Sequence, residues 1–214
     1  MESGQADERE KWSGEQIAQM PWVNICLVAA NVIVFLICTF TGELLYNKGA
    51  FGVAEIMKDG SFYRIFTSMF LHADTQHLFN NMIILFFVGE IVEKKVGHIS
   101  YVLIYFLSGI AGNVFSMGYE LLSGEYYSSV GASGAVFGVE GALFLLVLLN
   151  RGKLESITMG RLAFAILFSL YCGFTGTHTN NAAHVGGILT GFAVAALIIF
   201  LCPSHQNKKG YRTQ

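Results

Sequence analysis

Charged residues are scarce in this sequence. Asp, Glu, Lys and Arg make up 13% of its 214 residues, whereas soluble domains carry about 25%. Hydrophobic residues make up 53%, and the mean hydropathy is +0.52. The formal net charge of −2 provides no basic surface, so we expect no nucleic-acid partner. A deficit of charge on this scale predicts a protein whose surroundings are a lipid bilayer.

Proline, cysteine and the motifs of soluble hydrolases are also rare or missing. Two prolines beside 24 glycines predict largely unkinked helices that pack closely. The four cysteines all lie in apolar runs, where we expect inert thiols rather than disulfides. There is no H-E-x-x-H zinc motif, no P-loop and no G-x-S-x-G after a strand. We therefore expect neither a metal nor another cofactor.

Long apolar runs account for most of the chain. About 20 residues cross the hydrocarbon core of a membrane, and six runs reach or approach that length: 21–41, 77–96, 100–122, 133–150, 159–174 and 183–202. We predict an all-α polytopic membrane protein, a bundle of six transmembrane helices over residues 21–202. Residues 1–20 are polar, without a cleavable signal peptide, so we expect a cytosolic tail there and another at 203–214. The aromatic-rich stretch 42–76 is expected to lie at the membrane interface.

The distribution of Lys and Arg predicts the orientation of these helices. With the N-terminus inside, ten of the 13 Lys and Arg residues fall on the inner side and three on the outer side. Because positive residues stay in the cytosol, we expect both termini there and the protein in the plasma membrane. The fourth run, which begins at Ser133, then starts on the extracytoplasmic side. No internal repeat is visible, so an inverted-repeat transporter has no support.

The segment 128–138, SSVGASGAVFG, is polar and rich in glycine before it becomes apolar. A helix that begins at Ser133 leaves its first backbone N–H groups unpaired and has the positive end of its dipole there. Such an environment suits a nucleophile whose substrate develops negative charge on a carbonyl oxygen. The alternative is that Ser133 only caps the helix, as serine often does.

Other polar side chains lie at the same predicted depth as Ser133. His77 and Asn81 are four residues apart and share a face of the second helix, while His184 begins the sixth. Small residues allow the fourth and sixth helices to approach closely: Gly134, Gly138, Gly187 and Gly191. This approach would bring His184 within hydrogen-bond reach of Ser133, as a general base for a nucleophile. Alternatively, the glycines only pack the two helices and the histidine is incidental.

The remaining polar and aromatic candidates fit around this pair. His77 and Asn81 are possible donors to an oxyanion, together with the Ser133 backbone N–H. Alternatively, they form a polar network that fixes the second helix. Phe137, one turn after Ser133, is placed to lie under the His184 ring, a position that ordinary core packing would also explain.

Acidic residues are missing from the predicted neighbourhood of His184. Glu140 lies on the face of the candidate nucleophile, but about 10 Å deeper at 1.5 Å per residue. We therefore predict a dyad without a third member, and Glu140 has no assigned role. Glu93 is expected to form a structural ion pair with the adjacent Lys94 or Lys95.

Three short motifs occur in order along the chain: HLFNN at 77–81, GASG at 131–134 and AHVGGILTG at 183–191. Together they resemble the motifs of the rhomboid intramembrane serine proteases, each on the corresponding helix. The resemblance covers about residues 22–202 and is closest to the six-helix bacterial form. It implies hydrolysis of peptide bonds in or near transmembrane segments of membrane proteins.

The resemblance also implies roles for individual residues. Ser133 is expected as the nucleophile and His184 as the general base, with His77, Asn81 and the Ser133 amide in the oxyanion hole. Phe137 stands where the family has an aromatic ring under the catalytic histidine.

The first loop, residues 42–76 between the first two apolar runs, carries a further point of resemblance. Tyr63-Arg64 is similar to the family's Trp-Arg pair, with tyrosine in place of tryptophan.

The function that follows is a serine endopeptidase that cleaves unwound transmembrane segments. A polar mouth would admit water: Ser128, Ser129, Thr177, Thr179, Asn180 and Asn181. Residues 175–182 would form a mobile lid over the site. Two alternatives stay open: a catalytically silent relative that binds and escorts transmembrane segments, and a small-solute channel that uses the polar cluster with Glu90 and Glu140. The physiological substrate and the oligomeric state stay open as well.

Overall fold

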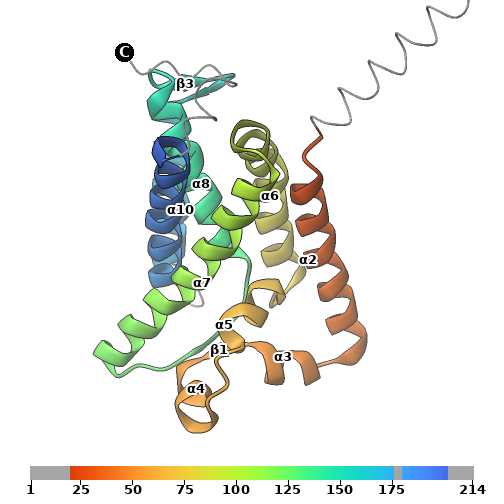
Figure 1. Ribbon diagram of the computed structural model, residues 1–214. Coiled ribbons are helices and arrows are strands. Elements are labelled where there is room, and N and C mark those ends of the chain that lie inside the picture. The colour runs from red at the N-terminus through yellow and green to blue at the C-terminus, as the bar shows by residue number, and fades with distance from the viewer. Residues whose placement is uncertain (1–19, 176–179, 202–214) are drawn as a thin grey trace, which may run out of the picture.

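The computed structural model describes residues 20–175 and 180–201, which fold into a bundle of long helices (Figure 1). The long helices are α2 (Trp22–Thr41), α6 (Thr75–Val96), α7 (His98–Ser123), α8 (Ser133–Leu149), α9 (Met159–Thr175) and α10 (Asn181–Leu201). Each of the six predicted apolar runs forms one of these helices, and every end lies within two residues of its prediction. The predicted tails at 1–20 and 203–214 lie outside the described residues, apart from Met20.

Not all of these helices have the length and composition of a membrane span. Within the described residues, α2, α7 and α10 are long and apolar enough to cross a membrane, whereas α8 and α9 are apolar but shorter. The last two turns of α6 carry four charged residues. These properties agree with an all-α membrane protein.

The helix α8 occupies the centre of the bundle because it has no polar face. Thirteen of its 17 residues are buried, as expected for a helix that is apolar all round. It packs against α6, α7 and α10. The contact with α10 is the tightest, because a Cβ atom on Gly187 or Gly191 would overlap the carbonyl oxygen of Gly134 or Gly138. The two backbones therefore touch along this glycine-lined seam.

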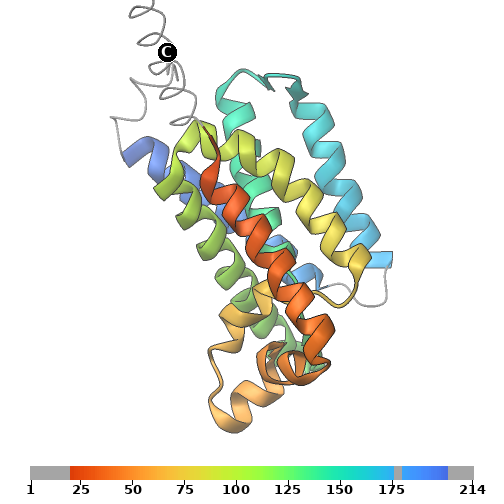
Figure 2. The ribbon, with the colours of Figure 1, turned by 90° about the vertical axis from the view of Figure 1, so that its right-hand side faces the viewer.

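The helix α9 lies at the edge of the bundle, beyond α6 when viewed from the side of α2 (Figure 2). Four large apolar side chains on it are exposed: Phe164, Leu167, Phe168 and Tyr171. In a membrane protein such a face is turned to lipid, so the other long helices support α9 from one side only.

Short elements between α2 and α6 cover one end of the bundle (Figure 1). They are α3 (Leu44–Gly49), β1 (Phe51–Gly52), α4 (Val53–Asp59), α5 (Arg64–Thr67) and the 3-10 turn η1 (Ser68–Phe70). The buried Arg64 guanidinium holds them together by donating to the carbonyl oxygens of Ala50 at 2.9 Å and Asn47 at 3.0 Å. The exposed Tyr63 ring has its centroid 5.9 Å from Arg64 Cζ. β1 pairs antiparallel with β2 (Ser128–Ser129), which ties this first loop to the segment before α8.

The opposite end of the bundle carries the start of α2, the end of α10 and the hairpin of β3 (Lys153–Leu154) and β4 (Ile157–Thr158) (Figure 1). Cys26 and Cys38 of α2 are free thiols. Cys172 and Cys202 lie outside the residues whose side chains are described.

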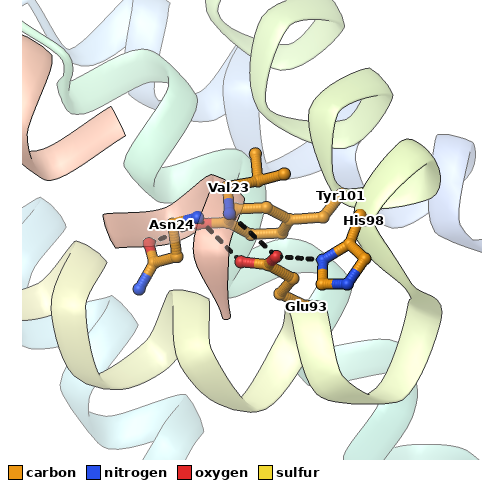
Figure 3. A network of polar contacts seen from close by, with 5 residues as sticks. All are labelled: Val23, Asn24, Glu93, His98 and Tyr101. Atoms are coloured by element: carbon orange, nitrogen blue, oxygen red, sulfur yellow. Dashed lines mark hydrogen bonds and ion pairs between the residues drawn. The ribbon is translucent and has the colours of Figure 1, made fainter. Parts of the chain in front are cut away.

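Glu93 lies at this second end, and the predicted ion pair with one of the two lysines after it is wrong. Its buried carboxylate accepts from the backbone N–H groups of Val23 at 3.0 Å and Asn24 at 2.7 Å, while His98 Nδ1 lies 2.5 Å away (Figure 3). The Tyr101 hydroxyl donates to Asn24 Oδ1 at 2.8 Å. The unpaired amides at a helix N-terminus attract a carboxylate, so Glu93 joins α2 to α6. The two lysines form ion pairs with other carboxylates, Lys94 with Glu90 and Lys95 with Glu155.

Candidate active site

The helices α8 and α10 begin side by side, at the end of the bundle that the first loop covers. Ser133 is the first residue of α8, and His184 lies in the first turn of α10. His184 Nε2 lies 2.9 Å from Ser133 Oγ, which is hydrogen-bond distance. The N-cap of α8 is Ala132 and no side chain caps the helix, so the interpretation of Ser133 as a cap is wrong.

The imidazole of His184 is buried between α8 and α10. The Phe137 ring of α8 stacks against it, with ring centroids 4.3 Å apart and an interplanar angle of 26°. The Nδ1 atom of His184 has no hydrogen-bond partner among the described residues. Within the described part of the chain, the serine and the histidine thus form a pair that no carboxylate extends.

Ser133 and His184 line a cavity of about 650 Å³, together with His77, Asn81 and Phe137. Asn81 donates one side-chain N–H to the His77 carbonyl oxygen at 3.1 Å, one turn earlier on α6. Its amide carries a second N–H, and Ser133 has one of the N–H groups that no helical carbonyl accepts. The cavity thus brings the three predicted oxyanion donors together beside the serine.

Gly131 makes room for the His77 imidazole next to the serine. Its φ of +140° lies in the region that favours glycine. A Cβ atom here would come within 2.8 Å of His77 Cε1 and 2.9 Å of His77 Nε2. The Gly131 N–H donates to the Ser68 carbonyl oxygen at 3.0 Å, which fixes this approach from the side of the first loop.

Asp74 and His72 determine the surroundings of His77. Asp74 is the N-cap of α6, and its side chain accepts from the His77 backbone N–H at 2.8 Å. His72 is fully buried, its ring centroid lies 5.2 Å from that of His77, and neither of its ring nitrogens has a partner among the described residues. Burial, reinforced by the nearby His77, lowers the pKa of His72 from 6.5 to about 4. This histidine is therefore neutral at pH 7 and adds no charge beside the site.

The predicted polar mouth is present in part. Ser128, Ser129 and Asn180 line the cavity. Asn181 is not part of its lining, and its side-chain oxygen is buried without a hydrogen-bond partner among the described residues. Thr177 and Thr179, and with them half of the predicted lid at 175–182, lie outside the described residues.

Glu140 is buried in α8, and one of its carboxyl oxygens has no hydrogen-bond partner within the described residues. It does not line the cavity, so it receives no role in the site. The described residues contain no group of three His, Cys, Asp or Glu side chains that could hold a metal ion.

Sequence reasoning missed two buried polar residues near the site, His72 and Glu120. Both are completely buried. Glu120 could have been noticed in the sequence, because it lies near the end of an apolar run. A carboxylate is costly to place in a membrane and usually has a function there. For His72 the only signal was a second histidine five residues before His77.

The fold and the site together define a polytopic helical membrane protein with a serine–histidine pair at one end of its bundle. A family model described as the Rhomboid domain matches residues 59–200. The chain belongs to the rhomboid family, and the resemblance found in its motifs is confirmed.

Curated relatives come from bacteria and plants. Rhomboid protease GluP of Bacillus subtilis (strain 168) is 32% identical over 183 residues, which cover 83% of this chain and 35% of GluP. The rhomboid YdcA of the same strain is 32% identical over 193 residues, covering 88% of this chain and 85% of YdcA. RHOMBOID-like protein 4 of Arabidopsis thaliana is 27% identical over 227 residues, which cover 90% of this chain and 56% of the plant protein. The chain thus spans about a third of GluP and just over half of the plant protein.

Proposed function

We propose that this protein is an intramembrane serine endopeptidase that hydrolyses peptide bonds in or near transmembrane segments of other membrane proteins. The observation that carries the proposal is the 2.9 Å contact between His184 Nε2 and Ser133 Oγ on the wall of a cavity between helices. A serine becomes a nucleophile when a base lies at this distance. The protease names of relatives such as GluP support the same class of reaction.

Acylation follows from this geometry. Ser133 Oγ attacks the carbonyl carbon of the scissile bond while its proton moves to His184 Nε2, and the carbonyl π electrons move to the oxygen. When the tetrahedral intermediate collapses, the C–N bond breaks and His184 gives the proton to the leaving nitrogen. In deacylation, water adds its oxygen to the acyl carbon and its proton to His184, which returns a proton to the departing Ser133 oxygen.

The negative oxygen of each intermediate needs donors that are already in place. The Ser133 backbone N–H, the free N–H of Asn81 and the His77 imidazole face the same cavity. Preorganised donors of this kind are worth about 2.7–4 kcal/mol each in a protease. Phe137 supports the base by stacking against it.

Substrate access is proposed between α6 and α9. Ile83 and Ile84 of α6 and Ser169 of α9 line the cavity, so it extends toward the gap between these two helices. A helical substrate shields its own carbonyl groups and must unwind before attack, so small or helix-breaking residues near the scissile bond lower the cost. Water for deacylation would enter on the side of Ser128, Ser129 and Asn180.

The proposed orientation places the site on the extracytoplasmic side of the plasma membrane. The end of the bundle opposite the site carries Lys94, Lys95, Arg151, Lys153 and Arg161. Positive residues of this kind mark the cytosolic side, where we also propose both termini. All six long helices then cross the bilayer.

The alternative is a silent family member that binds transmembrane segments without cutting them. To separate the two, the purified protein in detergent is incubated with a transmembrane-segment substrate, and the products are identified by mass spectrometry. Ser133→Ala and His184→Ala should each abolish cleavage, whereas Ser156→Ala, a matched change at an exposed serine between β3 and β4 at the opposite end of the bundle, should leave most of it. Cleavage that survives Ser133→Ala excludes a serine protease, and binding without cleavage by the wild type favours the silent binder.

A further inference from the structure

A carboxyl group that the proposed reaction does not use is buried near the end of α7. Glu120 is completely buried. Its Oε1 accepts from the Ser116 hydroxyl at 3.0 Å, and its Oε2 accepts from the Tyr127 backbone N–H at 3.3 Å. Tyr127 belongs to the segment that leads through β2 into α8 and Ser133. One oxygen of Glu120 therefore holds the chain that delivers the nucleophile.

The other oxygen reaches the helix that carries the base. Asn180 donates its side-chain N–H groups to the Ser116 hydroxyl at 2.7 Å and to the Ser129 hydroxyl at 3.2 Å. Asn180 in turn starts α10, because its Oδ1 accepts from the Ala183 N–H at 3.0 Å and its carbonyl oxygen from the His184 N–H at 3.2 Å. A continuous series of hydrogen bonds thus runs from Glu120 through Ser116 and Asn180 to the backbone of His184.

We propose that Glu120 is a positioning residue, which fixes the separation of Ser133 and His184 by holding the two segments that precede them. The inference rests on the proposed function. Glu120 does not line the cavity, so it acts only through these segments. Loss of a buried acceptor leaves its donor unpaired, which is costly. A displacement of about 1 Å at a reacting pair costs about 100-fold in rate.

Two substitutions weaken the series at different places. Glu120→Gln keeps the size of the side chain but puts an N–H group where an acceptor is needed. Asn180→Asp keeps the oxygen that caps α10 but cannot donate to Ser116 or Ser129. Glu125→Gln is the matched control, since it removes an exposed carboxylate five residues away in the same segment.

The experiment measures kcat and KM on a transmembrane substrate, the labelling rate of Ser133 by a fluorophosphonate, and the thermal unfolding temperature. We expect Glu120→Gln and Asn180→Asp each to lower kcat and the labelling rate by about 10-fold or more, with KM within about twofold of wild type. Glu125→Gln should change neither rate. The double variant should be no slower than the slower single variant, because both substitutions interrupt one series.

The outcomes separate this inference from the proposed function. If the wild type cleaves and labels but both variants keep its kcat, the positioning role is overturned while the protease stands. A loss of unfolding temperature with kcat preserved in the folded fraction assigns Glu120 to stability alone and also overturns the inference. If Glu120→Gln does not fold, the same measurements on Asn180→Asp test the inference, because Asn180 is only half-buried. A wild type that neither cleaves nor labels removes the proposed function and this inference with it.

Discussion

The Phe137 ring lies against the imidazole of His184, with centroids 4.3 Å apart and planes inclined by 26°. Phe137 stands one turn after Ser133 on α8, so in the proposed reaction the helix that supplies the hydroxyl also orients the ring that would receive its proton. Because no described residue bonds to His184 Nδ1, the proposed function gives this contact part of the orienting role that a carboxylate has in a triad. The proposed base is thus held by a stacked ring, and no carboxylate of the described residues contacts it.

Replacement of Phe137 by alanine should therefore slow the proposed reaction. Aromatic pairs contribute about 0.5–1.5 kcal/mol beyond the area they bury, so we expect kcat to fall by about 2- to 10-fold while KM changes little. Steady-state kinetics on a transmembrane substrate measure this. Phe164→Ala is the control, because that ring is exposed on α9 and stacks only on Phe168 among the described rings. An unaltered kcat, with or without a change in KM, would contradict the orienting role of Phe137.

The glycine-lined seam between α8 and α10 gives a second prediction. A Cβ atom on Gly187 would overlap the backbone of Gly134, which cannot rotate away as a side chain would. We expect Gly187→Ala to separate the helices, to destabilise the protein by about 3 kcal/mol and to lower cleavage. Thermal unfolding in detergent measures the first effect and substrate cleavage the second.

Gly118→Ala on α7 is the matched control for this substitution. A Cβ atom there meets nothing within 4 Å, and alanine favours a helix by up to about 1 kcal/mol over glycine. Its unfolding temperature should stay the same or rise. Equal unfolding temperatures for the two variants would contradict the close backbone contact.

Sequence reasoning predicted the helices because their signal is local. The length of each apolar run can be read directly from the sequence, and all twelve ends of the six helices fall within two residues of the prediction. The approach of His184 to Ser133 could also be predicted from the sequence. The distribution of Lys and Arg places both residues at the same depth in the membrane, and the glycines of α8 and α10 indicate that these two helices pack closely. The short elements over residues 44–70 were not predicted. They depend on Arg64, whose partners become clear only once the loop has folded around it.

Long-range polar contacts account for the rest of the differences. Glu93 was paired with its sequence neighbours, but its partners are amides 69 and 70 residues away at the start of α2. The Ser116–Asn180 bond joins residues 64 positions apart, so the role inferred for Glu120 has no signature in the local sequence. Serine is a preferred residue at helix N-caps, yet the Ser133 hydroxyl contacts His184 instead of capping α8. Local preference was outweighed by a tertiary partner in each case.

His72 predicts a pH dependence of stability. Its pKa falls from 6.5 to about 4 in the folded protein because it is buried beside His77. The unfolded state therefore binds a proton more readily, and stability that is complete above about pH 7 is lost as the pH falls from 6.5 toward 4. At pH 5 this loss is about 2 kcal/mol. His72→Phe should remove it, so the difference between variant and wild-type unfolding temperatures should grow in favour of the variant between pH 7 and pH 5. Above pH 7 the difference between the two unfolding temperatures should stay constant. A difference that also stays constant between pH 7 and pH 5 would contradict a buried, neutral His72.

The Glu93 network at the other end of the bundle gives the last prediction. Its carboxylate satisfies two N–H groups of α2 and contacts His98 (Figure 3). In Glu93→Gln one acceptor oxygen becomes a donor, which leaves a buried amide of α2 unpaired at a cost of about 1–3 kcal/mol. We expect a lower unfolding temperature in detergent and faster hydrogen exchange in the first turns of α2, with exchange at the start of α8 unchanged. Glu90→Gln, one turn earlier and with a partly exposed lysine partner, should cost at most about 0.5 kcal/mol. If both variants lose the same stability, the effect comes from charge at this end of α6 and not from the junction with α2.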